Sequence, residues 1–304
     1  MIRVSGLSKN YGEKRVLDNV SFTLEDGEVT GLLGLNGAGK TTTIRILTGF
    51  LVPGAGSVEI DGVNLFENPL EAKKKTGYLP ETPPLYEEMT VGEYLEFVCR
   101  LKDVRSPAEE IARVMEKTGI TAVQHQVIGS LSLGYRKRTG IAQALVGDPA
   151  LIVMDEPVSG LDPRQIVEMR ELIAGLSGTV LVSSHILSEV YKTCDRFLLL
   201  RDGKIAARFT HKELEDEMKK NRRLEIRIAG GSADEIRKVL EGMPLAETVV
   251  FAGDFAEGAL FHVTAASIDG FRRELFPVLA GRGLELVEIH SLDLTLEDIF
   301  IDRA

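Results

Sequence analysis

Apolar and polar residues alternate with different periods along this chain, and the changes of period predict its elements. Two-residue alternation near the N-terminus predicts antiparallel strands over 2–7, 16–24 and 56–62. From about 91 to 147 the period becomes helical, with Leu95, Val98 and Leu101 on one face. Short apolar runs separated by helical stretches then follow at 151–154, 180–183 and 197–200. Strands that alternate with helices predict a mainly parallel sheet flanked by helices, an α/β fold.

The pattern starts afresh after a charged segment that ends near residue 220. Strand-like alternation occurs over 224–228, 248–251, 260–263 and 284–289. Helical periodicity occurs over 234–240, over 268–279 and in a closing segment, 296–300. The order βαββαβ predicts a small α+β domain of the ferredoxin-like type. We therefore expect two domains, 1–220 and 221–304.

Composition narrows the class of protein. The chain has 304 residues, of which 27% are charged and 44% hydrophobic, as in ordinary globular proteins. Its net charge of −10 argues against a protein that coats nucleic acid, because such binding depends on neutralising phosphates. We therefore expect no nucleic-acid partner.

Cysteine content and hydropathy indicate the compartment. The chain has 2 cysteines, Cys99 and Cys194, without metal-type spacing, which fits a reducing environment. Residues 1–5 lack the apolar core of a signal peptide, and no apolar run approaches the roughly 18 residues that cross a bilayer. These features predict a cytosolic protein that can still dock on a membrane protein.

The strongest chemical signal is a glycine-rich segment between a predicted strand and a predicted helix. It fits G-x-x-x-x-G-K-[ST] and extends through Gly34, Leu35, Asn36, Gly37, Ala38, Gly39, Lys40, Thr41 and Thr42. Glycines let successive N–H groups face one point, and the helix N-terminus adds partial positive charge. Lys40 would reach the outer phosphates and the Thr41 hydroxyl would ligate magnesium. The segment predicts a site for a nucleoside triphosphate.

Two acidic residues end the apolar run 151–154. Asp155 and Glu156 are costly to bury without a partner, which metal and phosphate would supply. Asp155 would then hold magnesium and Glu156 would act as general base on water. The alternative is a solvated acidic strand end. His185 follows the run 180–183 and is either a phosphate contact or a surface or core histidine.

The segment 131–138 also suggests an anion site. Ser132 and Gly134 would open a helix whose first N–H groups can cap an anion. The alternative interpretation is an ordinary N-capped helix with a basic face, formed by Arg136, Lys137 and Arg138.

Taken together, these motifs resemble the ATP-binding cassette (ABC) family, specifically the nucleotide-binding subunit of a transporter. The resemblance covers about residues 1–212 and the motifs occur in the family's order. They are the phosphate loop 34–41, the signature motif 131–135, the acidic pair, the dimer loop 159–162 and the switch histidine, His185. The family fold is a P-loop NTPase with an antiparallel β subdomain and a helical subdomain, here about 78–147.

The resemblance also implies further site residues. Tyr11 matches the aromatic that stacks on adenine, and Val16 would pack against the ribose. Glu81 stands where a glutamine usually touches magnesium and the attacking water. In the family signature a glycine and a glutamine usually occupy the positions of Leu133 and Tyr135. These departures resemble a subgroup linked to exporters and to gliding or copper-processing transport systems.

The same resemblance implies the mechanism and partners. Two copies would share each ATP and Mg²⁺, with Lys40, Thr41 and Asp155 from one copy and Ser132, Gly134 and Tyr135 from the other. A separate multi-spanning permease would hold this homodimer on the inner face of the cell membrane. The alternatives are a non-transport ABC ATPase and an ATP-responsive regulatory module.

Overall fold

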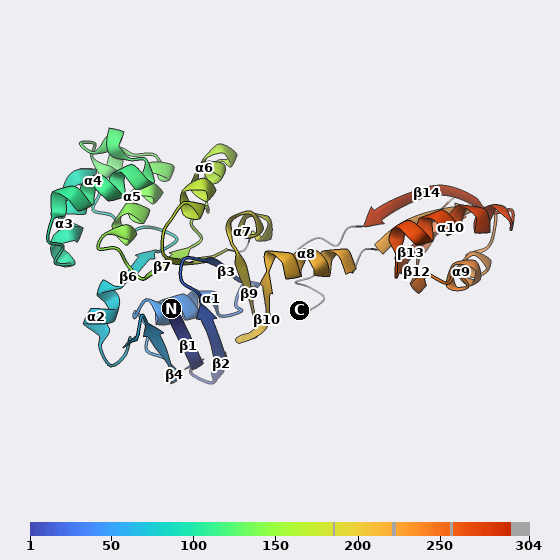
Figure 1. Cartoon of the computed structure of the whole chain (residues 1–304), viewed down its shortest axis with the longest axis horizontal. Helices are drawn as coiled ribbons and strands as arrows, with labels where there is room; N and C mark the ends of the chain where they lie inside the picture. Colours follow the sequence, from blue (N-terminus) through green and yellow to red (C-terminus); the bar gives the residue numbers. More distant parts are fainter. Residues whose placement is uncertain (185, 221–222, 256–257, 293–304) are drawn as a thin grey trace. The chain divides into compact units, whose positions relative to one another are not determined.

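The chain forms two compact units. The computed structural model describes residues 1–184, 186–220, 223–255 and 258–292 (Figure 1). The first unit, the cassette, is Met1–His211, and the second, the tail, is Lys212–Ala304. The division falls at the start of helix α8 (His211–Lys220), so the expected boundary near 220 lies inside the second unit.

A six-stranded sheet forms the centre of the cassette, in the order β10-β9-β3-β8-β7-β6. All neighbouring pairs are parallel except β9 and β10, which are antiparallel. The strands are β3 (Val29–Leu33), β6 (Thr76–Leu79), β7 (Leu151–Asp155), β8 (Thr179–Ser183), β9 (Arg196–Arg201) and β10 (Lys204–Thr210). The apolar runs that predicted parallel strands belong to β7, β8 and β9, which are almost wholly buried, as strands covered on both faces must be.

A second, antiparallel sheet has the order β2-β1-β4-β5. Its strands are β1 (Ile2–Tyr11), β2 (Lys14–Leu24), β4 (Ala55–Ile60) and β5 (Val63–Asn64). Its inward residues and helix α1 (Lys40–Leu47) share one core with β7, β8 and β9 of the larger sheet. Helix α1 therefore joins the two sheets, which holds its N-terminus in a fixed place.

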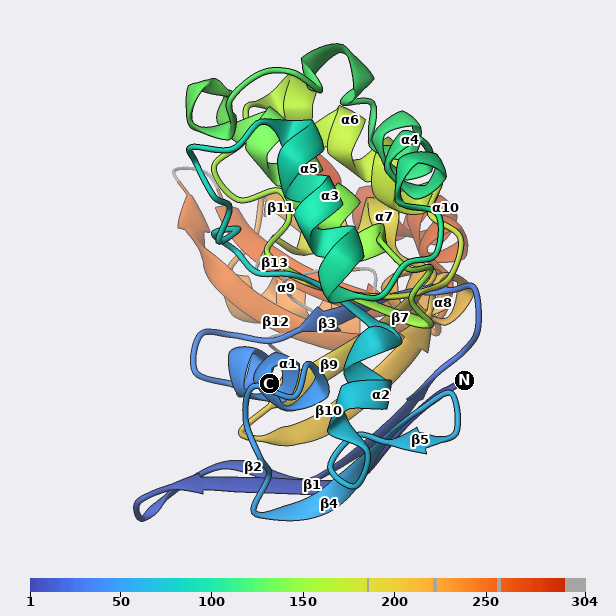
Figure 2. The ribbon, with the colours of Figure 1, turned by 90° about the vertical axis from the view of Figure 1, so that its left-hand side faces the viewer.

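Helices gather at the opposite end of the cassette from the antiparallel sheet (Figures 1 and 2). They are α3 (Val91–Leu101), α4 (Pro107–Thr118) and α5 (Leu133–Leu145), with short 3₁₀ turns at Thr121–Val123 and Ile128–Ser130. Thr90 and Glu93 form a capping box that begins α3, a device that contributes about 1 kcal/mol. Three further cassette helices are α2 (Pro69–Lys74), α6 (Pro163–Ala174) and α7 (Leu187–Thr193).

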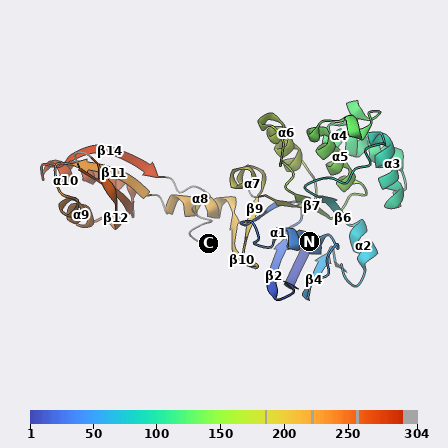
Figure 3. The same cartoon turned by 180° about the vertical axis from the view of Figure 1, so that it is seen from behind.

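The tail has the predicted βαββαβ order. Its elements are β11 (Arg223–Ala229), α9 (Ala233–Glu241), β12 (Ala246–Phe255), β13 (Gly258–Ala265), α10 (Ile268–Ala280) and β14 (Glu285–Leu292). The antiparallel sheet has the order β12-β13-β11-β14, and α9 and α10 pack on its apolar face (Figure 3). This is the strand order of a ferredoxin-like domain, and it confirms the predicted fold class.

The expected closing helix at 296–300 lies outside the described residues. Within the described ranges, no helix has the length and apolarity that would let it cross a membrane.

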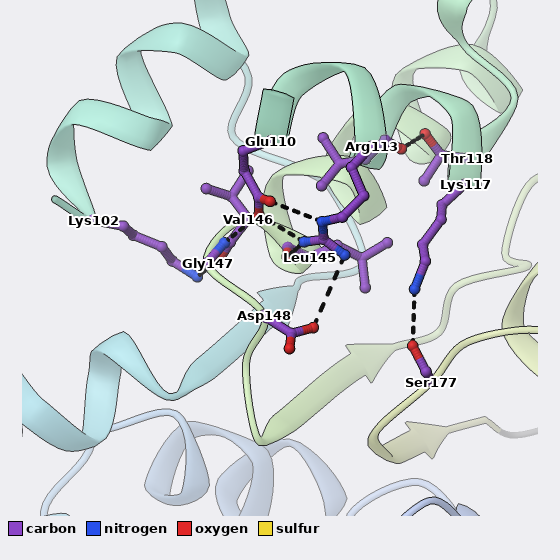
Figure 4. Close-up of polar contacts among 11 residues, drawn as sticks. Lys102, Glu110, Arg113, Lys117, Thr118, Leu145, Val146, Gly147, Asp148 and Ser177 are labelled. Atoms are coloured by element: carbon purple, nitrogen blue, oxygen red, sulfur yellow. Dashed lines mark hydrogen bonds and ion pairs between the residues drawn. The ribbon is translucent and has the colours of Figure 1, made fainter. Parts of the chain in front are cut away.

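A polar network ties α4 to the loop that follows α5 (Figure 4). The Arg113 guanidinium donates to both carboxylate oxygens of Glu110, at 2.8 and 2.6 Å, and to the Leu145 carbonyl at 3.0 Å. Glu110 also accepts from the Gly147 N–H at 2.7 Å. The guanidinium, first of all, holds the pKa of Glu110 below its ordinary value. These bonds satisfy backbone groups at the end of α5 that the helix itself cannot pair.

Lys102 contributes a cation to the same network. Its Nζ donates to the Val146 carbonyl at 2.7 Å. Burial lowers the pKa of this amine from 10.5 to about 8, although the nearby Glu110 carboxylate acts in the opposite direction. The folded chain therefore binds the Lys102 proton less tightly than the unfolded chain does.

This shift predicts a pH-dependent stability. Between about pH 8 and 10.5 the unfolded chain holds more protons, so the wild type gains stability as the pH rises through that window. Lys102→Met removes this dependence. We compare the free energy of unfolding of the wild type with that of Lys102→Met. The difference, wild type minus variant, should rise by on the order of 2 kcal/mol between pH 7 and pH 9.5. Urea unfolding followed by circular dichroism measures the difference.

Lys117→Met is the matched control, because Lys117 lies on α4 with an exposed side chain that bonds Ser177 Oγ at 2.8 Å. It should change stability by the same amount at both pH values. A wild-type-minus-Lys102→Met difference that stays constant with pH would contradict the prediction.

Candidate nucleotide site

The site lies where three neighbouring parallel strands end. In the sheet order, β8 separates β3 from β7, and all three run in the same direction. β3 leads into the glycine-rich loop 34–39 and helix α1, β7 ends at Asp155, and β8 ends at Ser183. Because parallel strands end at one edge, the loop and the acidic pair come together there, as in other open α/β sheets that bind ligands.

The buried end of the glycine-rich loop packs closely against β2. Gly39 has φ 110, in the region that favours glycine, and a Cβ there would lie 2.7 Å from Leu17 Cδ2. Leu35, Asn36 and Gly37 are exposed, whereas Ala38 and Gly39 are buried against the strands. The loop is therefore exposed at residues 35–37, and only glycine fits where it meets β2.

Lys40 begins α1 and extends over the loop. Its Nζ donates to the Gly34 carbonyl at 2.6 Å and to the Leu35 carbonyl at 3.4 Å. Burial lowers the pKa of the Lys40 amine, and the negative charges of Glu156 and Asp155 act in the opposite direction. The structure thus brings the amine and both carboxylates, which are more than a hundred positions apart in sequence, into one electrostatic group.

Asp155 and Thr41 have the chemistry that a magnesium ion requires. The Ser183 hydroxyl donates to Asp155 Oδ1 at 2.5 Å, which orients the carboxylate, and the Thr41 side chain is exposed at the start of α1. Among the described residues, no group of three or more His, Cys, Asp or Glu side chains could hold a metal unaided. One or two protein oxygens completed by phosphate oxygens are the usual set for Mg²⁺, so these residues fit it.

Glu156 is buried and has an uncommon backbone conformation. Its side chain is 9% exposed, and its φ of 49 lies in the left-handed region, which costs a non-glycine residue about 1 kcal/mol or more. Its N–H donates to the carbonyl and to the hydroxyl oxygen of Ser183, each at 3.2 Å. The Ser184 hydroxyl donates to Glu156 Oε2 at 3.4 Å. The last residue of β8 therefore holds the backbone of Glu156, and the residue after the strand contacts its carboxylate.

Glu81 follows β6 and is exposed. The Ser159 hydroxyl, in the predicted dimer loop, donates to Glu81 Oε1 at 3.4 Å. Three residues after Ser159, Asp162 caps α6 by accepting from the Gln165 N–H at 2.9 Å. Glu81 is thus joined to the segment that follows Glu156.

The signature residues lie on another element. Ser132 caps α5, and its hydroxyl accepts from the Tyr135 N–H at 3.4 Å. Ser132 and Tyr135 are exposed, and Gly134 is buried where a Cβ would lie 3.1 Å from the Gln165 side chain. Lys40 is the first residue of α1 and Ser132 is the N-cap of α5, so these two helix N-termini belong to different parts of the cassette.

The remaining predicted residues are Tyr11, Val16 and His185. Val16 lies beside the loop, since its carbonyl would be 3.0 Å from a Cβ at Gly39. Tyr11 ends β1 with a side chain 47% exposed, and the Lys9 amine lies 6.0 Å from its ring centre. His185 lies outside the described residues.

The basic face, one of the two interpretations of 131–138, is not formed as that alternative expects. Lys137 does not belong to an exposed basic face, because it is only 2% exposed and its Nζ donates to the Glu156 carbonyl at 3.0 Å. Its neighbours Arg136 and Arg138 instead pair with Glu87 and Glu168. Helical spacing contained a signal, because Lys137 lies three positions after Gly134 and four before Ile141, both buried.

Comparisons with known proteins agree with this geometry. A family model described as ABC transporter matches residues 17–159. The bacitracin transport ATP-binding protein BcrA of Bacillus licheniformis is 32% identical over 99% of this chain and 96% of its own length. The lantibiotic transport ATP-binding protein SrtF of Streptococcus pyogenes is 35% identical over 67% of this chain and 89% of its own length.

A solved structure described as the ATP-binding subunit of an ABC transporter superposes with a TM-score of 0.63 at 30% identity. The match covers 78% of this chain and 97% of that one. Likeness over nearly the whole length of relatives, together with the phosphate loop and acidic pair at one sheet edge, identifies the family. The chain belongs to the ABC transporter family and is an ATP-binding ATPase subunit of that family.

Proposed function

We propose that this chain drives an exporter by hydrolysing ATP as a homodimer bound to a separate membrane permease. One observation carries the proposal: the loop and helix that carry Lys40 meet Asp155 and Glu156 at one edge of the parallel sheet, where the charges of both carboxylates act on the amine. Transfer of a phosphoryl group to water needs a cation on the outer phosphates, an oxygen ligand for the metal and a base for the water. These three residues would supply those groups.

The nucleotide would lie along the phosphate loop. The backbone N–H groups of 34–42 and the Lys40 amine would bind the phosphates, while Tyr11 would stack on the adenine and Val16 would pack against the ribose. The exposed arc Leu35–Asn36–Gly37 supports this assignment. Mg²⁺, held by Thr41 and Asp155 with Glu81 nearby, would neutralise the charge that develops on the phosphate oxygens.

Glu156 would take the proton from the attacking water. The carboxylate is held by the Ser184 hydroxyl and is largely buried, so it is oriented and partly desolvated. We propose that His185 contacts the γ-phosphate beside it. In that arrangement Glu156 would act on the water while Lys40 would stabilise the charge on the phosphate oxygens.

The second half of the site would come from a second copy. The exposed N-terminus of α5, with Ser132, Gly134 and Tyr135, would cap the γ-phosphate bound to the other subunit. A two-fold axis then makes both sites equivalent. Loss of the γ-phosphate removes the bridge between the copies, which gives the switch its two states.

Transport across a membrane would require another chain. The names of the bacitracin and lantibiotic relatives support a transport role, and the departures at Glu81, Leu133 and Tyr135 support the exporter subgroup. We propose that the permease holds the ATPase on the inner face of the cell membrane. Copurification of a multi-spanning membrane protein with this chain would distinguish transport from a non-transport ATPase or a regulatory module.

Replacement of the proposed base should separate binding from hydrolysis. Glu156→Gln keeps the size and the Ser184 contact but cannot accept the proton, so phosphate release should slow by at least about 100-fold while ATP binding persists. A phosphate-release assay and a fluorescent-ATP titration measure the two quantities. Glu171→Gln, an exposed change on α6, is the matched control and should behave as wild type. Turnover within about twofold of wild type in Glu156→Gln would remove the residue from this role.

Removal of the loop amine should abolish tight binding. Lys40→Ala deletes the cation that contacts the outer phosphates, a charge-assisted bond worth about 1.5–3 kcal/mol, so the Kd should rise by about 10–100-fold or more. Titration of fluorescent ATP in the presence of magnesium measures the change. Lys192→Ala, exposed on α7, is the control. Wild-type affinity in Lys40→Ala would contradict the assignment of the loop.

A further inference from the structure

Lys137 is a charged residue in a position where charge is costly. It lies on α5 with 2% of its surface exposed and is among the largest of the fully buried side chains described. Gly134, Lys137, Ile141 and Ala144 all lie on the buried face of the helix. Removing an ammonium group from water costs free energy unless hydrogen-bond or charge partners compensate it. The partners of Lys137 therefore indicate why the charge is buried.

Those contacts are with the acidic part of the nucleotide site. The Lys137 amine donates to the Glu156 carbonyl at 3.0 Å. Burial lowers the pKa of Lys137, and the carboxylates of Glu81 and Glu156 act in the opposite direction. The amine therefore contacts the backbone of Glu156 and lies close enough to both carboxylates for their charges to act on it.

The hydrogen bond completes a two-sided hold on the Glu156 backbone. On one side the Glu156 N–H donates to Ser183 of β8. On the other side the carbonyl accepts from Lys137 of α5. Between them the residue adopts its left-handed φ of 49, which an L-residue leaves readily unless its neighbours prevent it. The direction in which the side chain leaves the backbone depends on that conformation.

Helix α5 is itself seated closely against the sheet. Gly140, one turn after Lys137, approaches the end of β6 so nearly that a Cβ would lie 2.6 Å from Leu79 Cδ1 and 3.1 Å from Pro83. The helix backbone can approach so closely only because the residue is glycine. The backbone of Lys137 is therefore held in place, and the amine extends from a rigid helix.

We propose that Lys137 is a positioning residue for ATP hydrolysis, which holds the backbone of Glu156 so that its carboxylate faces the attacking water. The proposal rests on the function proposed above, because it needs Glu156 as the general base. Lys137 acts through Glu156 and has no contact of its own with phosphate or water in this scheme. Its removal should lower kcat with little effect on ATP affinity.

Two variants with side chains of similar length distinguish the effect of losing the hydrogen bond from the effect of changing the side-chain volume. Lys137→Met removes the donor and the buried charge, whereas Lys137→Gln keeps an N–H donor close to the Glu156 carbonyl. Lys137→Met should lower kcat at least about 10-fold and leave the Kd for fluorescent ATP within about twofold of wild type. Lys137→Gln should keep a kcat several-fold above that of Lys137→Met.

Thermal unfolding of the full chain distinguishes a positioning role from a structural one. Lys137→Met relieves the desolvation of the amine but leaves the Glu156 carbonyl without this donor, so the variant should still unfold cooperatively, with a melting temperature within about 5 °C of wild type, although it is slower. Equal kcat for the Met and Gln variants, or wild-type kcat for Lys137→Met, would overturn the proposal. A Lys137→Met chain that does not fold would overturn it as well, since the bond would then support the fold rather than the base.

The double variant tests whether Lys137 acts through Glu156. In the Glu156→Gln background, Lys137→Met should slow phosphate release by less than about twofold, because the group that it positions is already inactive. A further 10-fold loss would overturn the proposal. If Glu156→Gln itself hydrolyses ATP at the wild-type rate, the function proposed above fails. If Lys137→Met hydrolyses ATP at the wild-type rate while Glu156→Gln does not, the positioning role of Lys137 fails and the proposed function stands.

Discussion

Two adjacent carboxylates at the end of a buried strand are the constraint on which the cassette depends. Asp155 and Glu156 follow four buried apolar residues, so their charges enter a region from which water is largely excluded. The chain compensates with groups from three other elements. Ser183 on β8 orients Asp155, Lys40 on α1 supplies a facing cation, and Lys137 on α5 bonds the Glu156 carbonyl. The same carboxylates and cations are the groups that the proposed function would use on metal and phosphate.

Much of this arrangement could be predicted from the sequence because it depends on local pattern. Period-2 and period-3.6 alternation indicated the strands of the core and the helices of the tail, and the αL-prone glycines of the loop indicated the turn before α1. The carboxyl ends of β3 and β7 then had to share an edge once the sheet was parallel. The unusual backbone of Glu156 had no such local signal, since the partners that maintain it are far away in sequence.

The basic run at 136–138 illustrates that limit. Three consecutive cations resemble a solvated helix face, yet each has a different environment: Arg136 pairs with Glu87, Arg138 with Glu168, and Lys137 enters the interior. Consecutive helical residues point about 100° apart, so a run of one residue type cannot occupy one face. Which of the three is buried follows from tertiary partners such as the Glu156 carbonyl. Side-chain chemistry alone does not reveal that choice, whereas the spacing to Gly134 and Ile141 does.

Helix α5 begins at the exposed Ser132 and, little more than one turn later, carries Lys137 to Glu156. In a two-fold pair, the start of this helix would meet the nucleotide of one site while its first turns reach the base of the other. A rigid α5 would then couple the occupancy of one site to the position of Glu156 in the other. The rigidity of α5 would therefore set how strongly the two sites of such a pair are coupled.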